Sequence, residues 1–368
     1  MTARILAACS PGEIRVVVVD GDTVIDYAIY RPGAPDGVGD IHRARVIARV
    51  PAMAGAFVAI AGTEGFLPDS GGAAGQTTGG TLTVQVTRAA QSGKGPRLRA
   101  AHGETDDLNG GPAPSLLRRG PSALERLAAQ YPTAAILIDS HAQAASLRAQ
   151  FGPRLTVVPT AFPEAIETEI DTLVSATVAI PGGGIMHIQP TSALIAIDID
   201  AGSRAAARTD KKTAQRAANR AMIPELARQI RLRNLSGAIV VDFAGMPARR
   251  RIALAPEFSA ALQTDPLHPR FLGFTALGLA EILRPRIHPP LHEQLAGPHA
   301  MGLAAFRALA RDITADPTKQ PRLRAAPAII AALQADSAAM REMTHHAGRP
   351  PILRADPTLS ATVWAIDL

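Results

Sequence analysis

The chain has 368 residues and a formal net charge of +6, from 38 lysine and arginine against 32 aspartate and glutamate residues. This length leaves room for two or three domains, and the basic balance favours an acidic partner, with nucleic acid first and a membrane surface second. Most of the positive charge is arginine, which suits phosphate groups, although a genome-wide composition bias explains it equally well. The single Cys9 excludes a disulfide framework and a thiolate zinc cluster within the chain. No apolar run of about 18 residues predicts a membrane span, and no apolar stretch near Met1 predicts a secretory signal. We therefore expect a cytoplasmic protein.

The first elements are predicted to be β-strands. Residues 5–8 and 13–30 have the apolar, β-branched pattern of strands, with a tight turn at Asp20 and Gly21. Between about residues 38 and 103, five more short strands separated by glycine corners predict a small closed barrel such as an OB-fold.

Two aromatic side chains of this barrel are candidates for binding nucleic acid. Phe57 and Phe66 precede the SGKGPRLR segment, which contains Lys94 and Arg97. Aromatic rings beside cations can stack bases and hold phosphates. The alternative is that both rings belong to the barrel core.

Helices and strands alternate from residue 121 to residue 176, after a polar, Gly-rich loop at residues 102–114. Helices are predicted at 121–131, 141–151 and 162–176, with strands at 134–140 and 154–160. This alternation is typical of an α/β layer.

Two later strands each end in an aspartate. The apolar segments LIAIDID (194–200) and GAIVVDFAGM (237–246) carry Asp198 and Asp242. A carboxylate between apolar neighbours is costly to ionise unless a cation or hydrogen bonds stabilise it. Two such acids on neighbouring strands would suit magnesium, which binds one or two carboxylates, waters and phosphate oxygens. Asp200 projects from the same strand face as Asp198. For each acid alone, a turn or helix cap is the alternative reading.

The segment between these strands predicts a basic helix over residues 212–234, kinked or split at Pro224. Arg249, Arg250 and Arg251, with Arg204 and Arg208, are candidates for holding a nucleic-acid backbone, or else form a solvated basic face.

The remaining elements are less distinctive. Residues 273–287 are predicted to form a helix. His288, His292 and His299 are predicted to lie in a loop that binds no metal, because Pro289 and Pro290 interrupt regular helical spacing. From residue 303 to residue 368, two helices and a closing strand predict a small α+β domain.

Several motifs together resemble the ribonuclease E/G family. The barrel has the succession VPAM, AFV and GFLP, followed by SGKGPRLR. The later motifs are ALIAIDID, ELARQIRLRNLSGAIVVDFAGM, GLAEILRPR, and the C-terminal FRALARDI and RAAPAIIAAL.

The resemblance implies a multidomain protein of α/β layers and a β-barrel. Residues 1–37 and 111–172 would form a degenerate ribonuclease-H-like layer, and 38–103 an inserted OB-fold. Residues 173–290 would form a deoxyribonuclease-I-like catalytic subdomain, and 303–368 the small domain.

It also implies an endoribonuclease that cleaves single-stranded RNA with magnesium, or with manganese as a substitute, and leaves a 5′-phosphate. Such an enzyme would act in RNA processing (including rRNA) or decay. Asp198 and Asp242 fall on the family's metal-binding aspartates, and Asp200 on a helper position that is usually asparagine. Phe57, Phe66 and Lys94 fall on RNA-contacting positions.

Two further departures affect assembly and end recognition. The cysteine pair that links protomers through zinc is replaced by LAGPHAMG, so neither zinc nor a zinc-linked dimer is expected. The segment that senses a 5′-monophosphate is reduced to HGETDDLNGGP, so no such end preference is expected. An RNA-binding protein that has lost catalysis is the main alternative, and a phosphohydrolase acting on DNA or a small nucleotide is a third.

Overall fold

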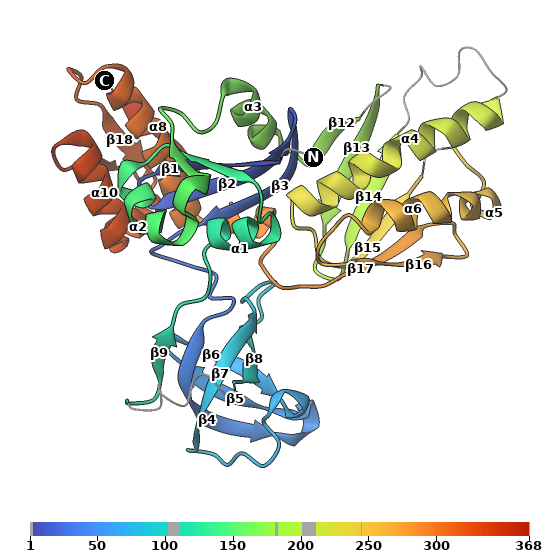
Figure 1. The fold of residues 1–368 in the computed structure, drawn as a ribbon, viewed down its shortest axis with the longest axis horizontal. Helices are drawn as coiled ribbons and strands as arrows, with labels where there is room; N and C mark the ends of the chain where they lie inside the picture. The colour runs from blue at the N-terminus through green and yellow to red at the C-terminus, as the bar shows by residue number, and fades with distance from the viewer. Residues whose placement is uncertain (1–2, 102–110, 181–182, 201–210, 244, 368) are drawn as a thin grey trace. The chain divides into compact units, whose positions relative to one another are not determined.

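The structure, a computed structural model, describes residues 3–101, 111–180, 183–200, 211–243 and 245–367, without the side chains of 211–216 and 218 (Figure 1). The chain forms two compact units. Unit 1 comprises Met1–Asp36, Pro121–Glu167 and His292–Leu368, and unit 2 comprises Gly37–Gly120 and Thr168–Leu291. None of the helices in these described ranges has the length and hydrophobicity that a membrane crossing needs.

The first sheet of unit 1 has five strands in the order β11-β10-β1-β2-β3. Its strands are β1 (Arg4–Ser10), β2 (Glu13–Asp20), β3 (Thr23–Tyr30), β10 (Ala135–Ile138) and β11 (Leu155–Val157). β1, β10 and β11 run parallel, whereas β1, β2 and β3 run antiparallel. Helices α1 (Ala123–Gln130) and α2 (His141–Phe151) follow the predicted pattern. Helix α1 starts with a capping box between Ser122 and Glu125, which satisfies two of its first N–H groups.

The C-terminal part of unit 1 is a three-stranded sheet, in the order β19-β18-β20, with helices. Its elements are α7 (Leu291–Gln294), α8 (Pro298–Ala315), β18 (Arg322–Ala325), α9 (Pro327–Ala335), α10 (Ser337–Ala347), β19 (Ile352–Ala355) and β20 (Trp364–Asp367). Helices α8 and α9 and strand β20 overlap the predicted elements, whereas α7, α10, β18 and β19 were not predicted. His292 and His299 lie on helices α7 and α8, so the predicted loop is wrong there, because the prolines sit at the helix starts where no N–H is required.

A glycine lets the β1–β2 turn approach this C-terminal domain. Gly12 has a φ of +80°, and a Cβ there would lie 2.6 Å from both the Cβ of Ala339 and a Cδ of Leu303. The Gly12 N–H donates to the Glu342 carboxylate at 2.7 Å. Any larger side chain would force these elements apart.

Unit 2 contains the predicted barrel. β4 (Ile41–Val50), β5 (Gly55–Ile60), β6 (Thr63–Pro68), β7 (Thr81–Arg88) and β8 (Arg97–Ala100) form a sheet that closes through the β4–β5 pairing. A sixth strand, β9 (Ser115–Arg118), adds to β4. Short 3-10 turns, Pro51–Met53 and Asp69–Gly71, flank β5 and β6. The closed five-stranded barrel confirms the expectation and is consistent with an OB-fold.

The second sheet of unit 2 has the order β12-β13-β14-β15-β17-β16. Its strands are β12 (Thr177–Ile180), β13 (Gly184–Pro190), β14 (Ile195–Asp200), β15 (Gly237–Asp242), β16 (Arg270–Phe274) and β17 (Ala280–Arg284). Helices α4 (Lys211–Leu232), α5 (Ala248–Arg251) and α6 (Ala255–Leu262) belong to the same part. Figure 1 shows α4 and α6 on one side of this sheet. The short helix α3 (Glu164–Thr172) precedes it.

One prediction for this region is wrong, and one of two alternatives predicted for Pro224 is excluded. Residues 273–287 do not form a helix but contribute to the antiparallel pair β16 and β17. In β17, Ala280, Ile282 and Arg284 are buried and alternate with more exposed residues, which is a strand period of two. Pro224 does not split its helix, since α4 runs through it as one element. The buried neighbours of that proline, Met222, Ile223, Leu226 and Ile230, pack into the sheet core and offset the lost hydrogen bond.

Candidate active site

Strand register places Asp198 and Asp242 side by side. β14 and β15 are parallel, and Asp198 pairs directly with Asp242. Paired residues of neighbouring strands lie about 4.8 Å apart and project to the same face. Both acids are exposed. The residues that alternate with them are buried in the core, namely Ile195, Ile197, Ile199, Ile239 and Val241. The acids therefore stand on the sheet face opposite the buried one.

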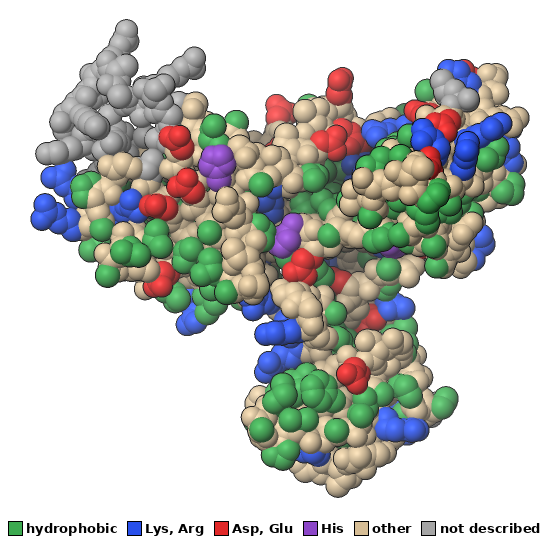
Figure 2. Space-filling model, turned by 180° about the vertical axis from the view of Figure 1, so that it is seen from behind, with side chains coloured by type: hydrophobic (Ala, Val, Ile, Leu, Met, Phe, Trp, Pro, Cys, Tyr) green, Lys and Arg blue, Asp and Glu red, His purple; other side chains and the backbone are tan. Residues whose placement is uncertain are grey.

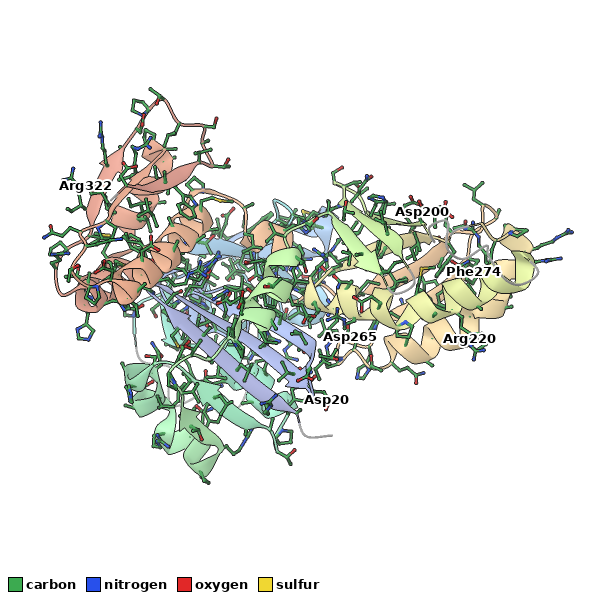
Figure 3. The ribbon with its side chains drawn as sticks, turned by 90° about the horizontal axis from the view of Figure 1, so that it is seen from above. Asp20, Asp200, Arg220, Asp265, Phe274 and Arg322 are labelled. Carbon is green, nitrogen blue, oxygen red and sulfur yellow. The ribbon has the colours of Figure 1, made fainter. Side chains whose placement is uncertain are left out.

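Asp200 stands on this same open face. It is exposed, lies two residues beyond Asp198, and pairs with Ile185 of β13. Figure 3 labels Asp200 at the end of β14. Asp198, Asp200 and Asp242 thus project from the same face, at the carboxyl ends of strands β14 and β15.

Arg251 connects Asp242 to two loops. Its guanidinium donates to the Asp242 Oδ1 at 2.5 Å, to the Met246 carbonyl at 2.9 Å and to the Gly278 carbonyl at 3.0 Å. The side chain of Arg251 is 11% exposed, whereas that of Asp242 is 51% exposed. One carboxylate oxygen of Asp242 is therefore held by a buried cation, and the residue stays open to solvent.

The backbone at Gly278 allows this arrangement. Its φ is +86°, and a Cβ there would lie 2.7 Å from the Cβ of Ala248, in helix α5. Sequence-based reasoning grouped Arg251 with Arg249 and Arg250. The structure separates them, because the latter two are exposed while Arg251 is buried against Asp242.

His187 was not among the predicted site residues. It pairs with Asp198 across β13 and β14, and with Thr177 across β12 and β13. The Thr177 Oγ1 and the His187 Nδ1 lie 3.4 Å apart. A row of side chains from Thr177 through His187 and Asp198 to Asp242 thus crosses four strands on one face. The alternation of apolar and polar residues in IMHIQ could have predicted that His187 faces away from the core, since Met186 and Ile188 on either side of it are buried.

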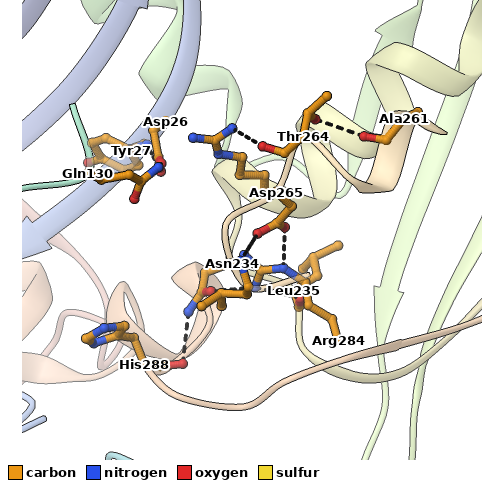
Figure 4. Close-up of polar contacts among 12 residues, drawn as sticks. Asp26, Tyr27, Gln130, Asn234, Leu235, Ala261, Thr264, Asp265, Arg284 and His288 are labelled. Carbon is orange, nitrogen blue, oxygen red and sulfur yellow. Dashed lines mark hydrogen bonds and ion pairs between the residues drawn. The ribbon is translucent and has the colours of Figure 1, made fainter. Parts of the chain in front are cut away.

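A buried ion pair fastens the other end of β17. Arg284 donates to Asp265 at 2.7 Å, to the Asn234 side chain at 2.6 Å and to the Leu235 carbonyl at 3.1 Å (Figure 4). Asn234 also donates to the carbonyls of His288 and Pro289. These bonds tie the end of helix α4 to β17 and hold β15, which lies beside β17, in register.

Three of the predicted barrel residues, Phe57, Phe66 and Arg97, lie next to one another. Phe57 and Phe66 are half-buried, their ring centroids lie 5.7 Å apart, and Phe66 pairs with the exposed Arg97. Neither ring belongs to the buried barrel cluster, which is built from Val58, Leu67, Leu98 and other residues. Lys94, three residues before Arg97 in the sequence, is exposed. Figure 2 shows lysine and arginine side chains interspersed with hydrophobic ones on the barrel.

The donor set suits a hard cation. Asp198 and Asp242 offer carboxylate oxygens on adjacent strands, which fits the preference of magnesium or manganese for oxygen ligands. Within the described ranges, no group of three or more histidine, cysteine, aspartate or glutamate side chains is assembled around one metal position. Waters or substrate oxygens would have to complete the coordination. Arg204 and Arg208 lie outside the described residues.

The comparisons with known proteins concern this same region. Residues 113–287 match the model of the Ribonuclease E/G family. This segment, a little under half of the chain, is therefore similar to that family. It includes both aspartate strands and Arg251 but excludes Phe57, Phe66, Lys94 and Arg97.

Individual ribonucleases E and G align with parts of the chain. Ribonuclease E of Synechocystis sp. is 32% identical over 164 residues, which is 44% of this chain and 22% of that protein. Ribonuclease E of Escherichia coli K12 is 36% identical over 129 residues, or 35% of this chain and 12% of that protein. Ribonuclease G of the same organism is 34% identical over 133 residues, or 35% of this chain and 27% of that protein. The ribonuclease E/G segment thus spans about a quarter or less of these relatives.

Proposed function

We propose that this protein is a metal-dependent endoribonuclease that cleaves single-stranded RNA by phosphodiester hydrolysis and leaves a 5′-phosphate. The observation that carries the proposal is the pairing of Asp198 with Asp242 on an open sheet face, inside the segment of the ribonuclease E/G family. Such an enzyme would act in the processing of RNA, including rRNA, or in its decay, in the cytoplasm.

The finer architecture is part of the proposal. Residues 1–37 with 111–172 would be the ribonuclease-H-like layer, 38–103 the OB-fold, 173–290 the deoxyribonuclease-I-like subdomain and 303–368 the small domain. Four sheets support this division: the five-stranded sheet of unit 1, the closed barrel, the C-terminal sheet, and the sheet of β12 to β17 that carries Asp198 and Asp242, hereafter the aspartate sheet.

Asp198 and Asp242 would hold Mg²⁺, with Mn²⁺ as a substitute. The bound ion supplies charge neutralisation for the scissile phosphate and orients an attacking water. Asp242 is oriented for this role by Arg251, which fixes one oxygen and leaves the other available. Asp200 would orient water or substrate from the same face, and it adds a negative charge where the family usually has an amide.

The RNA would be held by cations and rings outside the acid pair. Arg249 and Arg250 are exposed in α5, seven and eight residues beyond Asp242, and would contact phosphates. Phe57 and Phe66 would stack bases, with Lys94 and Arg97 on the backbone. No zinc-linked dimer and no preference for 5′-monophosphorylated RNA are expected.

A cleavage assay on a single-stranded oligonucleotide tests this function. With Mg²⁺, the protein should cut RNA carrying either a 5′-triphosphate or a 5′-monophosphate, and EDTA should abolish cutting. Asp198→Asn and Asp242→Asn should each lower kcat/KM about 100-fold or more, because charge stabilisation by the metal contributes several kcal/mol. Both variants should still bind RNA. Full activity of either variant would refute the assignment.

One observation favours a second candidate, an RNA-binding protein without catalysis. Arg251 already places a cation on Asp242 at 2.5 Å, which lowers the net charge offered to a metal. Under this alternative the protein binds RNA with a steep salt dependence but shows no metal-dependent cutting in the same assay.

A further inference from the structure

Two cavities lie in unit 1, where the parallel strands β1, β10 and β11 end. One has a volume of about 470 Å³ and is lined by residues from β1, β2, α3, α8 and α10. The other, of about 450 Å³, is lined by residues from β1, β2, α2 and α10. They share five lining residues, which are Cys9, Ser10, Pro11, Asp139 and His346. The carboxyl ends of parallel strands are where open α/β sheets bind ligands, and both volumes are in the range of small-molecule sites.

The wall of the larger cavity is rich in arginine. Arg15 forms a bidentate pair with Glu167, with both N–O distances 2.7 Å, and its guanidinium lies 5.0 Å from the Phe162 ring centroid. Arg307, one turn before Arg311 on α8, donates to Glu13 at 2.5 Å. Of these side chains, all except that of Glu13 line the cavity, namely Arg15, Phe162, Glu167, Arg307 and Arg311.

Positive charge exceeds negative charge in this cluster. Glu13 is shared by Arg307 and Arg31, at 2.5 and 2.9 Å, while Arg15 uses Glu167. Burial, together with repulsion from Arg15, lowers the pKa of Arg307. The buried guanidinium of Arg15 and the half-buried guanidinium of Arg307 thus repel each other, and each has one carboxylate partner.

Arg311 brings one more cation to the cavity. It is exposed, and the described part of the chain provides it with no hydrogen bond or ion pair. The remaining acid of the wall, Asp139, accepts hydrogen bonds from the backbone N–H groups of Cys9 and Ala161, at 2.7 and 3.3 Å. Both Asp139 oxygens are therefore engaged by the backbone, and the charge of Arg311 acts on Glu167, whose pKa it helps to lower.

We propose that the larger cavity binds the phosphate of a small phosphate monoester of nucleotide size, with Arg311 and Arg307 as the phosphate-binding cations. Arginine forks bind phosphate with two parallel hydrogen bonds. The neighbouring cavity accommodates the organic part of the ligand beside Ser140, Gln143 and Arg341. This site is independent of the aspartate sheet.

Calorimetric titration of the full chain tests the site without using RNA cleavage. The probes are inorganic phosphate, ribose 5-phosphate, AMP and adenosine. Saturable binding of AMP and ribose 5-phosphate is expected, with weaker binding of inorganic phosphate and none of adenosine. Adenosine binding as tightly as AMP, tightest binding of inorganic phosphate, or no saturable binding of either ester at millimolar concentration would overturn the proposal.

A pair of variants locates the binding. Arg311→Ala removes an exposed side chain and should weaken AMP binding about tenfold or more, since a hydrogen bond between charged groups is lost. Arg322→Ala, which removes an exposed arginine of the same unit outside both cavities (Figure 3), should leave binding unchanged. Equal affinities of the two variants would mean that AMP binds elsewhere.

Discussion

The two large sheets carry the same local sequence signal with opposite outcomes. AILID in unit 1, like IAID and AIVVD in unit 2, is an apolar strand that ends in an aspartate. Asp139 is tied down by two backbone N–H groups. Asp198 and Asp242 are exposed beside each other on an open face, and of these two acids only Asp242 has a side-chain partner within the described residues, namely Arg251.

This difference teaches what makes a strand-end acid available. Burial raises the pKa of Asp139, and its backbone hydrogen bonds only partly oppose that effect. Asp139 joins the ends of β1 and β10 to the loop at Ala161, which is a structural task. Within the described residues, no backbone N–H group donates to the carboxylate of Asp198 or Asp242, so their oxygens remain accessible to a cation.

The largest expected effect concerns Asp265, a buried acid in the turn between helix α6 and strand β16 of the aspartate sheet. Asp265→Ala leaves Arg284 buried without its ion-pair partner, and the side chains of this pair are only 5% and 4% exposed. Breaking a buried pair costs about 3–5 kcal/mol, which chemical denaturation will measure. Asp200→Ala, at an exposed acid of the same sheet, is the control and should change stability little. Equal stability of the two variants would contradict the distinction between acids held by buried partners and acids exposed to solvent.

Arg251→Ala tests whether the open acid needs its orienting cation. Loss of a residue that orients a metal ligand lowers metal affinity or activity about 10- to 100-fold. The metal concentration for half-maximal RNA cleavage should rise, and Arg251→Lys should restore part of it. Arg250→Ala, an exposed neighbour, should instead affect RNA binding. An unchanged metal dependence for Arg251→Ala would contradict the positioning role.

Asp139→Asn should lower stability but leave RNA cleavage unchanged. The asparagine cannot accept from both the Cys9 and the Ala161 N–H groups, so an unsatisfied donor costs about 1–2 kcal/mol of stability. RNA cleavage per folded molecule should match that of the unchanged protein. Thermal unfolding combined with the cleavage assay measures both, and a specific loss of cleavage would place Asp139 in the catalytic apparatus.

Glu167→Gln is expected to have the smallest effect, and one that depends on pH. Burial opposes the charge of Glu167, but the hydrogen bonds and charge of Arg15 outweigh it and lower the pKa of Glu167. Its contribution to stability is therefore complete above about pH 4.5, the unfolded value. That contribution is lost as the pH falls through the lowered pKa.

The unchanged protein should thus exceed Glu167→Gln in stability by about 1 kcal/mol at pH 7, and the difference should shrink towards pH 3. Urea unfolding at the two pH values measures it. A difference that grows on acidification would reverse the assigned sign.

Much of this fold follows from local patterns in the sequence. The alternation of apolar residues predicted the strands of the first sheet and of the barrel, and the paired aspartates predicted the position of the candidate site. These patterns are local, because a strand period or a helix cap depends on residues a few positions apart.

Tertiary structure decided the rest. Residues 273–287 could be read as a helix until β15 and β16 paired with β17, and Pro224 was tolerated because its helix packs on a sheet core. Three strands ended alike in aspartate, but only the contacts made by distant residues distinguished them. Cys9 and Ala161 satisfy Asp139, Arg251 orients Asp242, and the pairing of β13 with β14 brings His187 beside Asp198. A carboxylate's role depends on which hydrogen-bond donors and charges surround it, and the folded chain supplies those from far along the sequence.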